Sequence, residues 1–265
     1  MNASTLAAEA IRVGYHGRTV IDRLDLTVPT GAFTAIVGPN ACGKSTLLRT
    51  LGRMLHPEAG RVVLDGKAVG DMRGKEFARR VGLLPQSPVT PEAITVGDLV
   101  ARGRYPHQSL LRQWSEDDER IVADALDEVG MRDLAGRMVD ELSGGQRQRV
   151  WIAMALAQET GILLLDEPTT FLDIAHQIDV LELCASLTRR GRTVVAVLHD
   201  LNLAARYADR MVAMHEGAVI AQGTAAEVVT PEVLATAYSL DAIVLDDPET
   251  GRPLVVPRAR QGRVE

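Results

Sequence analysis

One short segment, residues 38–46, constrains the fold of this chain more than any other. It reads Gly-Pro-Asn-Ala-Cys-Gly-Lys-Ser-Thr and fits the pattern G-x-x-x-x-G-K-[ST]. The apolar run Phe33–Val37 precedes it and predicts a buried strand, while Leu47–Met54 follows it with helical periodicity. A strand, a glycine-rich turn and a helix in this order form the context in which such a pattern binds phosphate. The segment therefore predicts a phosphate cradle within an α/β fold.

The chemistry of the phosphate cradle follows from its residue types. Glycines allow backbone N–H groups to curl around an anion, and the following helix directs its positive end toward that anion. Lys44 adds a full positive charge, the Ser45 hydroxyl is suited to Mg²⁺, and the Cys42 side chain is expected to pack rather than react. Nine consecutive residues are therefore expected to bind ATP: Gly38, Pro39, Asn40, Ala41, Cys42, Gly43, Lys44, Ser45 and Thr46.

Two adjacent carboxylates end an apolar run later in the chain. Ile162–Leu165 leads directly into Asp166 and Glu167, as expected of a buried central strand that delivers acids to the ligand-binding edge of a sheet. Asp166 is predicted to hold Mg²⁺ through its water shell, and Glu167 to orient or deprotonate the water that attacks the γ-phosphate. By itself the pair would indicate only an acidic loop, but together with the cradle it indicates ATP hydrolysis.

A third motif, Leu142–Gln146, reads Leu-Ser-Gly-Gly-Gln. Ser143 and Gln146 have capping-box spacing at the start of a helix predicted over Gln146–Ala157. The Ser143 hydroxyl, the amides of Gly144 and Gly145 and the positive end of the helix together predict a second anion site. A capped surface helix without a ligand is the alternative that spacing alone allows.

Leu142–Gln146 resembles the signature of the ABC (ATP-binding cassette) family, which other P-loop ATPases lack. The resemblance implies that two copies pair head to tail, with Ser143 to Gln146 of one copy covering ATP in the other. It also implies four accessory roles: Tyr15 stacks on adenine, Gln86 senses the γ-phosphate and contacts the metal, Asp173 lies at the dimer interface, and His199 contacts the γ-phosphate. Gln86 and His199 thus join the predicted base as catalytic residues.

The resemblance and the residue pattern agree on a fold. We expect the α/β ABC ATPase fold of P-loop NTPases, with a RecA-like core, an antiparallel β subdomain and an inserted α-helical subdomain. Residues 1–230 are expected to form a single ABC ATPase domain, with the core in 1–90 and 159–230 and the helical subdomain in about 91–158. Residues 231–265 are expected to form a small C-terminal extension.

Individual elements are predicted from local pattern. A strand is expected over Ala10–Tyr15, and a helix over Lys44–Met54. A hairpin is expected over Arg210–Gln222, with its turn at Glu216-Gly217. A second hairpin is expected in the tail, around Asp247–Arg252. Ala41 departs from the glycine that is common in relatives of the family at that position.

Within the family, the chain most resembles the ATPase subunits of bacterial ferric-siderophore importers. The segments that carry this likeness are Leu83–Gln86, Ile94–Val96, Val100–His107, Thr169–Gln177, Val197–Asn202 and Asp247–Pro257. None of these segments is expected to contact iron or a siderophore, so the cargo is implied only by resemblance. Import of haem or cobalamin stays an alternative. The segment 102–107 is expected to form the rim of a groove for a permease, with a plain solvent loop as the alternative.

Other classes of ABC protein are less consistent with the sequence. Exporter cassettes usually carry a membrane domain in the same chain or a different sequence around Asp173. Soluble ABC proteins of ribosomes or DNA usually have duplicated cassettes or a long coiled-coil insertion. A catalytically silent subunit would be expected to lack Lys44, Glu167 or His199, all of which are present.

Composition and charge limit the expected cellular location and binding partners of the chain. The net charge of −6 argues against a nucleic-acid surface, and no apolar run reaches the roughly 18 residues of a membrane helix. The start lacks the pattern of a signal peptide, and Cys42 and Cys184 are far apart, so reduced thiols in the cytosol are expected. The implied partners are a second copy and a permease pair, with a substrate-binding protein reached indirectly, at the cytoplasmic face of the inner membrane.

Overall fold

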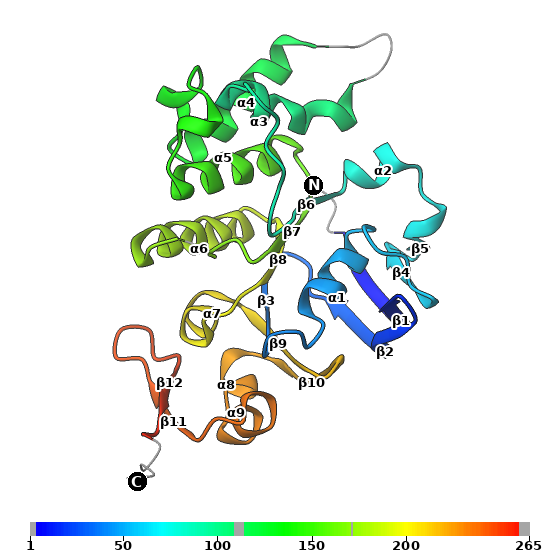
Figure 1. Ribbon diagram of the computed structural model, residues 1–265, viewed down its shortest axis with the longest axis vertical. Helices are drawn as coiled ribbons and strands as arrows, with labels where there is room; N and C mark the ends of the chain where they lie inside the picture. Colours follow the sequence, from blue (N-terminus) through cyan, green and yellow to red (C-terminus); the bar gives the residue numbers. More distant parts are fainter. Residues whose placement is uncertain (1–3, 109–113, 171, 260–265) are drawn as a thin grey trace.

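A central six-stranded sheet organises the molecule in the computed structural model, which describes residues 4–108, 114–170 and 172–259 (Figure 1). Its strand order is β10-β9-β3-β8-β7-β6. All neighbours pair in parallel except β9 and β10, which form the predicted hairpin. The strands are β3 (Phe33–Val37), β6 (Val81–Leu84), β7 (Ile162–Asp166), β8 (Thr193–Val197), β9 (Arg210–His215) and β10 (Ala218–Gly223).

A second, antiparallel sheet lies against one face of this core. Its order is β2-β1-β4-β5, formed by β1 (Leu6–Tyr15), β2 (Arg18–Val28), β4 (Ala59–Leu64) and β5 (Lys67–Ala68). The expectation that the first strand starts at Ala10 is wrong, because Leu6 to Ala8 pair with both β2 and β4 and extend the strand. Buried side chains of β1, β2 and β4 form one apolar core with residues from the facing side of the central sheet, such as Ile36 and Val212.

Helices pack on both faces of the central sheet, and some of them build a block at one end. The helices are α1 (Lys44–Leu51), α2 (Gly74–Ala78), α3 (Val96–Ala101), α4 (Glu116–Glu128), α5 (Gly144–Ala157), α6 (Ile174–Arg189) and α7 (Leu201–Tyr207). The helices α3, α4 and α5 pack on one another and form the block at the top of Figure 1. The helix predicted to reach Met54 ends at Leu51, because Gly52 ends the hydrogen-bonded turns and Arg53 adopts a positive φ.

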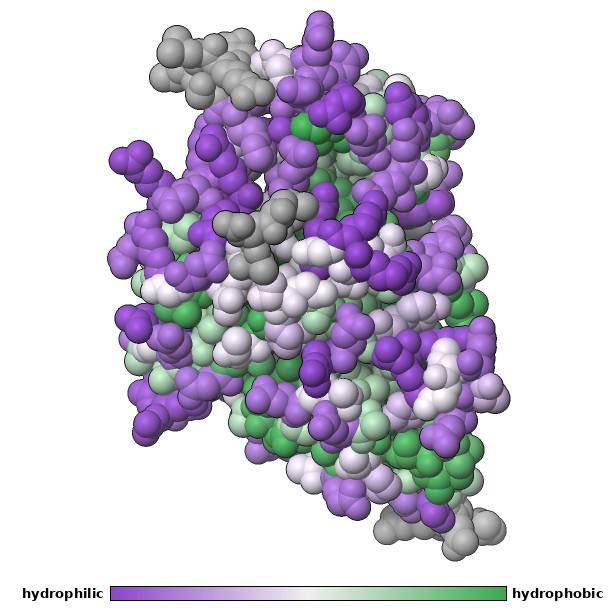
Figure 2. All heavy atoms as spheres, turned by 180° about the vertical axis from the view of Figure 1, so that it is seen from behind, coloured by the Kyte–Doolittle hydropathy of each residue, from purple (hydrophilic) through white to green (hydrophobic). Residues whose placement is uncertain are grey.

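The tail forms α8 (Ala225–Val228), α9 (Pro231–Tyr238) and a two-stranded sheet, β11 (Ala242–Asp246) with β12 (Pro253–Pro257). The side chain of Asn202 on α7 holds this hairpin, since its amide donates to the Val255 carbonyl (3.2 Å) and accepts from the Val255 N–H (2.7 Å). Figure 2 shows apolar surface at this end of the molecule, where Ile243 and Leu245 are exposed. Residues 260–265 of the predicted extension lie outside the described residues.

The boundaries proposed for the core, helical block and extension stay a prediction. Within the described part of the chain, no helix is both long enough and apolar enough to cross a bilayer.

Candidate nucleotide site

The phosphate cradle connects the end of β3 to the start of α1, as its sequence predicts. Gly38 lies so close to β9 that an added Cβ would collide with the Met214 carbonyl oxygen and come within 2.8 Å of the Cys42 sulfur. Its φ of +150° and the +105° of Gly43 are also conformations that side chains disfavour. Glycine is therefore required by both space and backbone geometry at Gly38, and by backbone geometry at Gly43.

Lys44 places a buried cation in the cradle. The residue is only 5% exposed, and its ammonium donates to the carbonyl oxygens of Gly38 and Pro39, each at 2.8 Å. Burial lowers the pKa of Lys44, although the acids Glu167 and Asp166 counteract this shift. Because this ammonium is removed from water, an anion placed beside it stabilises its charged form. The cradle is thus electrostatically prepared for phosphate.

Asp166 ends β7 with a fully buried carboxylate. The Ser45 hydroxyl donates to one of its oxygens at 2.7 Å, and Arg49 Nε lies 3.3 Å from the other. A hydroxyl and a carboxylate placed together are hard oxygen donors, which fit Mg²⁺. Arg49 was missed by the sequence analysis, although it lies four residues after Ser45 and so on the same face of α1.

Glu167 is the centre of a hydrogen-bonded cluster built from three neighbouring strands. Gln86 Nε2 donates to Glu167 Oε2 at 2.6 Å, and His199 Nε2 lies 2.7 Å from Glu167 Oε1. Thr170, which the sequence analysis missed, donates its hydroxyl to Oε2 at 3.1 Å. Glu167 has a φ of +55°, a strained conformation of the kind that concentrates at functional sites.

A cavity of about 270 Å³ lies at the cradle, lined by Val20, Asn40, Ala41, Gly43, Lys44, Ser45, Thr46 and Glu167. Val20 was not predicted, since nothing distinguishes it from other apolar strand residues. Tyr15, predicted to stack on adenine, lies at the end of β1 and is 38% exposed, outside the residues that line this cavity. The lining therefore includes six residues of the cradle and Glu167, but neither Asp166 nor the predicted adenine contact.

The predicted second anion site has the expected local structure. Ser143 Oγ accepts from the Gln146 N–H at 3.2 Å, and Gln146 Oε1 accepts from the Ser143 N–H at 3.1 Å, which completes the capping box of α5. Gly144 and Gly145 follow in the first turn. None of these residues lines the cavity at the cradle. The two predicted anion sites therefore lie apart from each other in one chain.

Asp173 lies next to the second anion site. It caps α6 by accepting from the His176 N–H at 2.9 Å, and this bond, together with one from the His176 ring, lowers the pKa of Asp173. The His176 ring lies 3.4 Å from the place where a Cβ on Gly145 would be. Asp173 and Gly145 therefore belong to one surface. Phe171 of the same segment lies outside the described residues.

The fold and the site define a P-loop ATPase. A family model described as ABC transporter matches residues 21–170, and the chain belongs to this family as an ABC ATPase subunit. It is 54% identical over 260 residues to the ferric enterobactin transport ATP-binding protein FepC of Escherichia coli (strain K12), covering 98% of this chain and 96% of the relative. The sequence-based recognition and the predicted fold class are confirmed.

Other relatives are named for different cargoes. The iron(3+)-hydroxamate import ATP-binding protein FhuC of Bacillus subtilis (strain 168) is 47% identical, covering 95% of this chain and 94% of the relative. The hemin import ATP-binding protein HmuV of Pseudomonas aeruginosa PAO1 is 43% identical, covering 96% and 100%. A dimeric bacterial ABC transporter cassette, MJ0796, superposes with a TM-score of 0.74 at 26% identity, covering 83% and 98%.

Proposed function

We propose that this chain is the ATP-hydrolysing motor subunit of a bacterial importer of ferric siderophores. The observation that carries the hydrolytic part is the position of Glu167, held between Gln86 and His199 beside the phosphate cradle. This arrangement supports a role for the carboxylate in accepting a proton from a water that attacks the terminal phosphate.

Hydrolysis then follows from the positions of these side chains. Water attacks the γ-phosphorus of ATP, the bond from that phosphorus to the bridging oxygen breaks, and ADP leaves with the electron pair. Glu167 accepts the proton of the attacking water, while Lys44 stabilises the charge on the phosphate oxygens. His199 and Gln86 hold Glu167 and face the same phosphate group.

Ser45, Asp166 and Gln86 would hold Mg²⁺. Gln86 uses its amide nitrogen for Glu167, which leaves its carbonyl oxygen for a hard cation. When bound, the ion would neutralise charge on the phosphates.

The separation of the two anion sites supports a head-to-tail dimer. Ser143 to Gln146 of one copy would cover ATP in the cradle of the other, with Asp173 at the interface. Tyr15 would stack on adenine at the open side of the cradle, where its ring is accessible. ATP would thereby hold two copies together, and hydrolysis would release them.

A permease pair would dock on the helical block. The segment 102–107, predicted as the rim of a groove, adjoins a cavity of about 570 Å³ lined by Asp98, Ala101, Arg102, Tyr105, Gln108 and Trp114. Tyr105 and Trp114 are large exposed aromatic residues, the type enriched at protein interfaces. The chain would then act at the cytoplasmic face of the membrane, with a substrate-binding protein on the other side.

Ferric siderophore is the cargo favoured by the names of the relatives, with ferric enterobactin at 54% identity and iron(3+)-hydroxamate at 47%. Hemin import at 43% keeps haem, and with it cobalamin, as the second candidate. Dimer closure would move the permeases, so cargo selection would lie outside this chain.

The test combines hydrolysis with uptake in cells that carry the wild-type chain, no chain, Glu167→Gln or the exposed control Glu232→Gln. We expect Glu167→Gln to bind ATP but to lose a hundredfold or more in turnover, on the order of what a general base contributes. Uptake of radiolabelled iron on one or more siderophores should fail without the chain and with Glu167→Gln, but not with Glu232→Gln. Near-normal turnover of Glu167→Gln would contradict the mechanism, whereas normal iron uptake with lost haem or cobalamin uptake would replace the cargo.

A further inference from the structure

The turn of the β9–β10 hairpin contacts the phosphate cradle through its backbone. Glu216 and Gly217 form this two-residue turn, with φ of +45° and +80°, between the paired residues His215 and Ala218. The Gly217 N–H donates to the Cys42 carbonyl oxygen at 2.9 Å. A distant part of the chain is therefore hydrogen-bonded to the cradle immediately before its second glycine.

The turn is also held tightly against the antiparallel sheet. A Cβ on Gly217 would lie 2.0 Å from the Val20 carbonyl oxygen of β2, a separation that backbone atoms do not allow. One residue before the turn pair begins, the hairpin also backs the start of the cradle, because a Cβ on Gly38 would lie 2.3 Å from the Met214 carbonyl oxygen. The hairpin thus supports the cradle at two points, and glycine at 217 is what allows the second.

The bond from Gly217 fixes the direction of the peptide that joins Cys42 to Gly43. A trans peptide is planar, so its carbonyl and its N–H point in opposite directions. Because the Cys42 carbonyl points toward the hairpin, the Gly43 N–H points away from the hairpin. Gly43 lines the cavity at the cradle, whereas neither Cys42 nor Gly217 does. The Gly43 N–H is therefore directed to the side on which phosphate would bind.

This peptide needs an external support because glycine follows it. Gly43 has a φ of +105°, and glycine has more backbone conformations available than any other residue. A rotated peptide would present the Cys42 carbonyl oxygen, in place of an N–H, to the bound phosphate. A carbonyl oxygen carries partial negative charge and would repel that phosphate. The bond to the Cys42 carbonyl opposes this rotation.

We propose that Gly217 is a positioning residue of the nucleotide site, whose N–H keeps the Cys42–Gly43 peptide in the orientation that presents the Gly43 N–H to a phosphate of ATP. This inference rests on the proposed function, in which the cradle binds ATP. Gly217 acts through the peptide and does not contact the nucleotide. The N–H groups of such a loop bind the α- and β-phosphates, so ATP and ADP both depend on Gly217.

The first experiment compares two glycines in turns of the same kind. Gly66 follows Asp65 in the β4–β5 turn, with φ of +77° and +52°, and in the described part of the chain a Cβ on Gly66 meets nothing within 4 Å. Gly217→Ala should therefore displace its turn from Cys42, whereas Gly66→Ala adds only backbone strain. We expect Gly217→Ala to weaken ATP and ADP binding to the full chain about tenfold, because one hydrogen bond is lost, and Gly66→Ala to leave both affinities unchanged.

Steady-state hydrolysis separates positioning from a merely structural role. Gly217→Ala should raise KM for ATP about tenfold and keep kcat within about twofold of the wild-type value, because the lost interaction is equal in the bound and transition states. A merely structural turn would lower thermal stability in both variants and leave KM unchanged in both.

Lys44→Ala distinguishes failure of this inference from failure of the proposed function. If Lys44→Ala weakens ATP binding while Gly217→Ala binds ATP like Gly66→Ala, the positioning role is wrong and the cradle assignment stands. If Lys44→Ala binds ATP like the wild-type chain, the cradle assignment is wrong and the positioning role is wrong with it.

A second experiment uses the wild-type chain and applies even if Gly217→Ala fails to fold. Coupling between binding events is reciprocal, so a bond that favours nucleotide binding is strengthened by bound nucleotide to the same degree. Amide hydrogen exchange of the Gly217 N–H should therefore slow about tenfold when Mg·ADP saturates the chain, while the Gly66 N–H exchanges at an unchanged rate. A Gly217 exchange rate that Mg·ADP leaves unchanged would overturn the proposal.

Discussion

The phosphate cradle and the second anion site, residues 143–146, use the same elementary device, a glycine-containing turn at a helix N-terminus. They differ in what surrounds that device. The cradle has a buried cation, Lys44, and a carboxylate pair within hydrogen-bonding reach. The second site has only its serine cap, glycine amides and the helix end.

In the proposed dimer, this difference explains why one chain needs a second. The cradle would supply charge, metal ligands and base, so we expect it to bind a nucleotide alone. The second site offers only partial charges, which become effective when a phosphate already held elsewhere is brought to it. The predictions below test that division of labour.

The largest effect on stability is expected from the buried ion pair of Arg104 and Asp118, which contacts α5, the helix that carries the second site. Arg104 is buried in the helical block, where it donates to Asp118 at 2.8 Å and to the Ala157 carbonyl at the end of α5 at 2.7 Å. Asp118→Ala removes the carboxylate that pairs with the buried Arg104 guanidinium, so it should lower the free energy of unfolding by about 3 kcal/mol. Urea denaturation measures it, and an unchanged midpoint would show that the pair does not support α5.

The same pair predicts a pH dependence. Burial acts to raise the pKa of Asp118, but hydrogen bonds from Arg104 and Ser115 outweigh it and lower the pKa. A carboxyl with a lowered folded pKa stabilises the fold above its unfolded pKa, about 3.9, and that contribution is lost as the pH falls through the folded value. The wild-type chain should therefore lose stability below about pH 4 more steeply than Asp118→Ala in an acid titration.

The next effect separates the cradle from the second site by nucleotide affinity. Lys44→Ala removes the buried cation and should weaken ATP binding to the isolated chain about tenfold to a hundredfold. Equilibrium binding of a fluorescent ATP analogue measures it. An affinity equal to that of the wild-type chain would contradict the assignment of the cradle.

A smaller effect is expected at the second site, with the opposite signature. Ser143→Ala removes the cap of α5, worth about 1 kcal/mol, and should lower ATP-dependent dimerisation and turnover about fivefold while ATP affinity of the isolated chain stays unchanged. Ser115→Ala is the matched control, because Ser115 caps α4 in the same way. Equal loss of turnover in both variants would show that only helix stability is involved.

The smallest effect concerns backbone strain in the cradle. Ala41 has a φ of +61°, a conformation that glycine adopts without the steric cost of a Cβ. Ala41→Gly should therefore stabilise the chain by at most about 1 kcal/mol. The control Ala226→Gly in α8 should destabilise by a similar amount. Thermal unfolding distinguishes the two signs, and destabilisation by Ala41→Gly would refute the strain argument.

Much of the cradle and of the hydrogen-bonded cluster around Glu167 could be predicted, but for different reasons. The cradle is one contiguous segment, so its pattern and context sufficed. Glu167 followed from an apolar run ending in acids. Gln86 and His199 were predicted only through resemblance, since a glutamine and a histidine after strands are common. Their meeting depends on strand order, because β6, β7 and β8 are neighbours and their carboxyl ends share one edge.

Other features of the structure could not be predicted from the sequence. Thr170 and Arg49 reach the acids by side-chain directions that depend on packing, and Val20 comes from the other sheet. The cavity that Ala8, Leu26 and Val212 line depends on the spacing between the two sheets, which no local pattern encodes. The tail hairpin was predicted, but its attachment through Asn202 was not.

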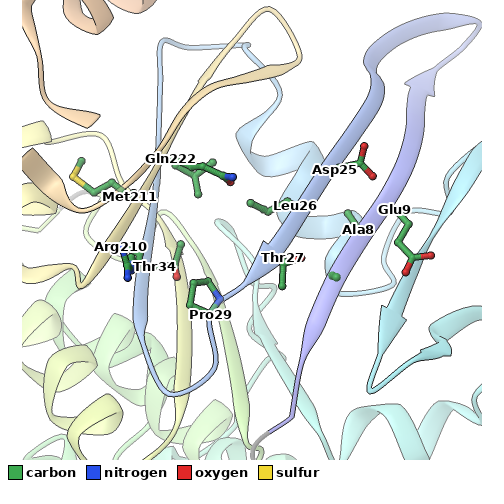
Figure 3. Close-up of a pocket in the computed structure, with 13 residues that line it drawn as sticks. Ala8, Glu9, Asp25, Leu26, Thr27, Pro29, Thr34, Arg210, Met211 and Gln222 are labelled. Carbon is green, nitrogen blue, oxygen red and sulfur yellow. The ribbon is translucent and has the colours of Figure 1, made fainter. Parts of the chain in front are cut away.

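The sequence by itself determined the chemistry of the cradle, the acidic pair and the capped signature helix, because each is set by residues close together along the chain. The tertiary structure decided which strand ends meet around Glu167, that the signature site lies apart from the cradle, and that a cavity lies between the two sheets (Figure 3). These features join residues from distant parts of the chain, and their positions are fixed by sheet order and packing rather than by local spacing.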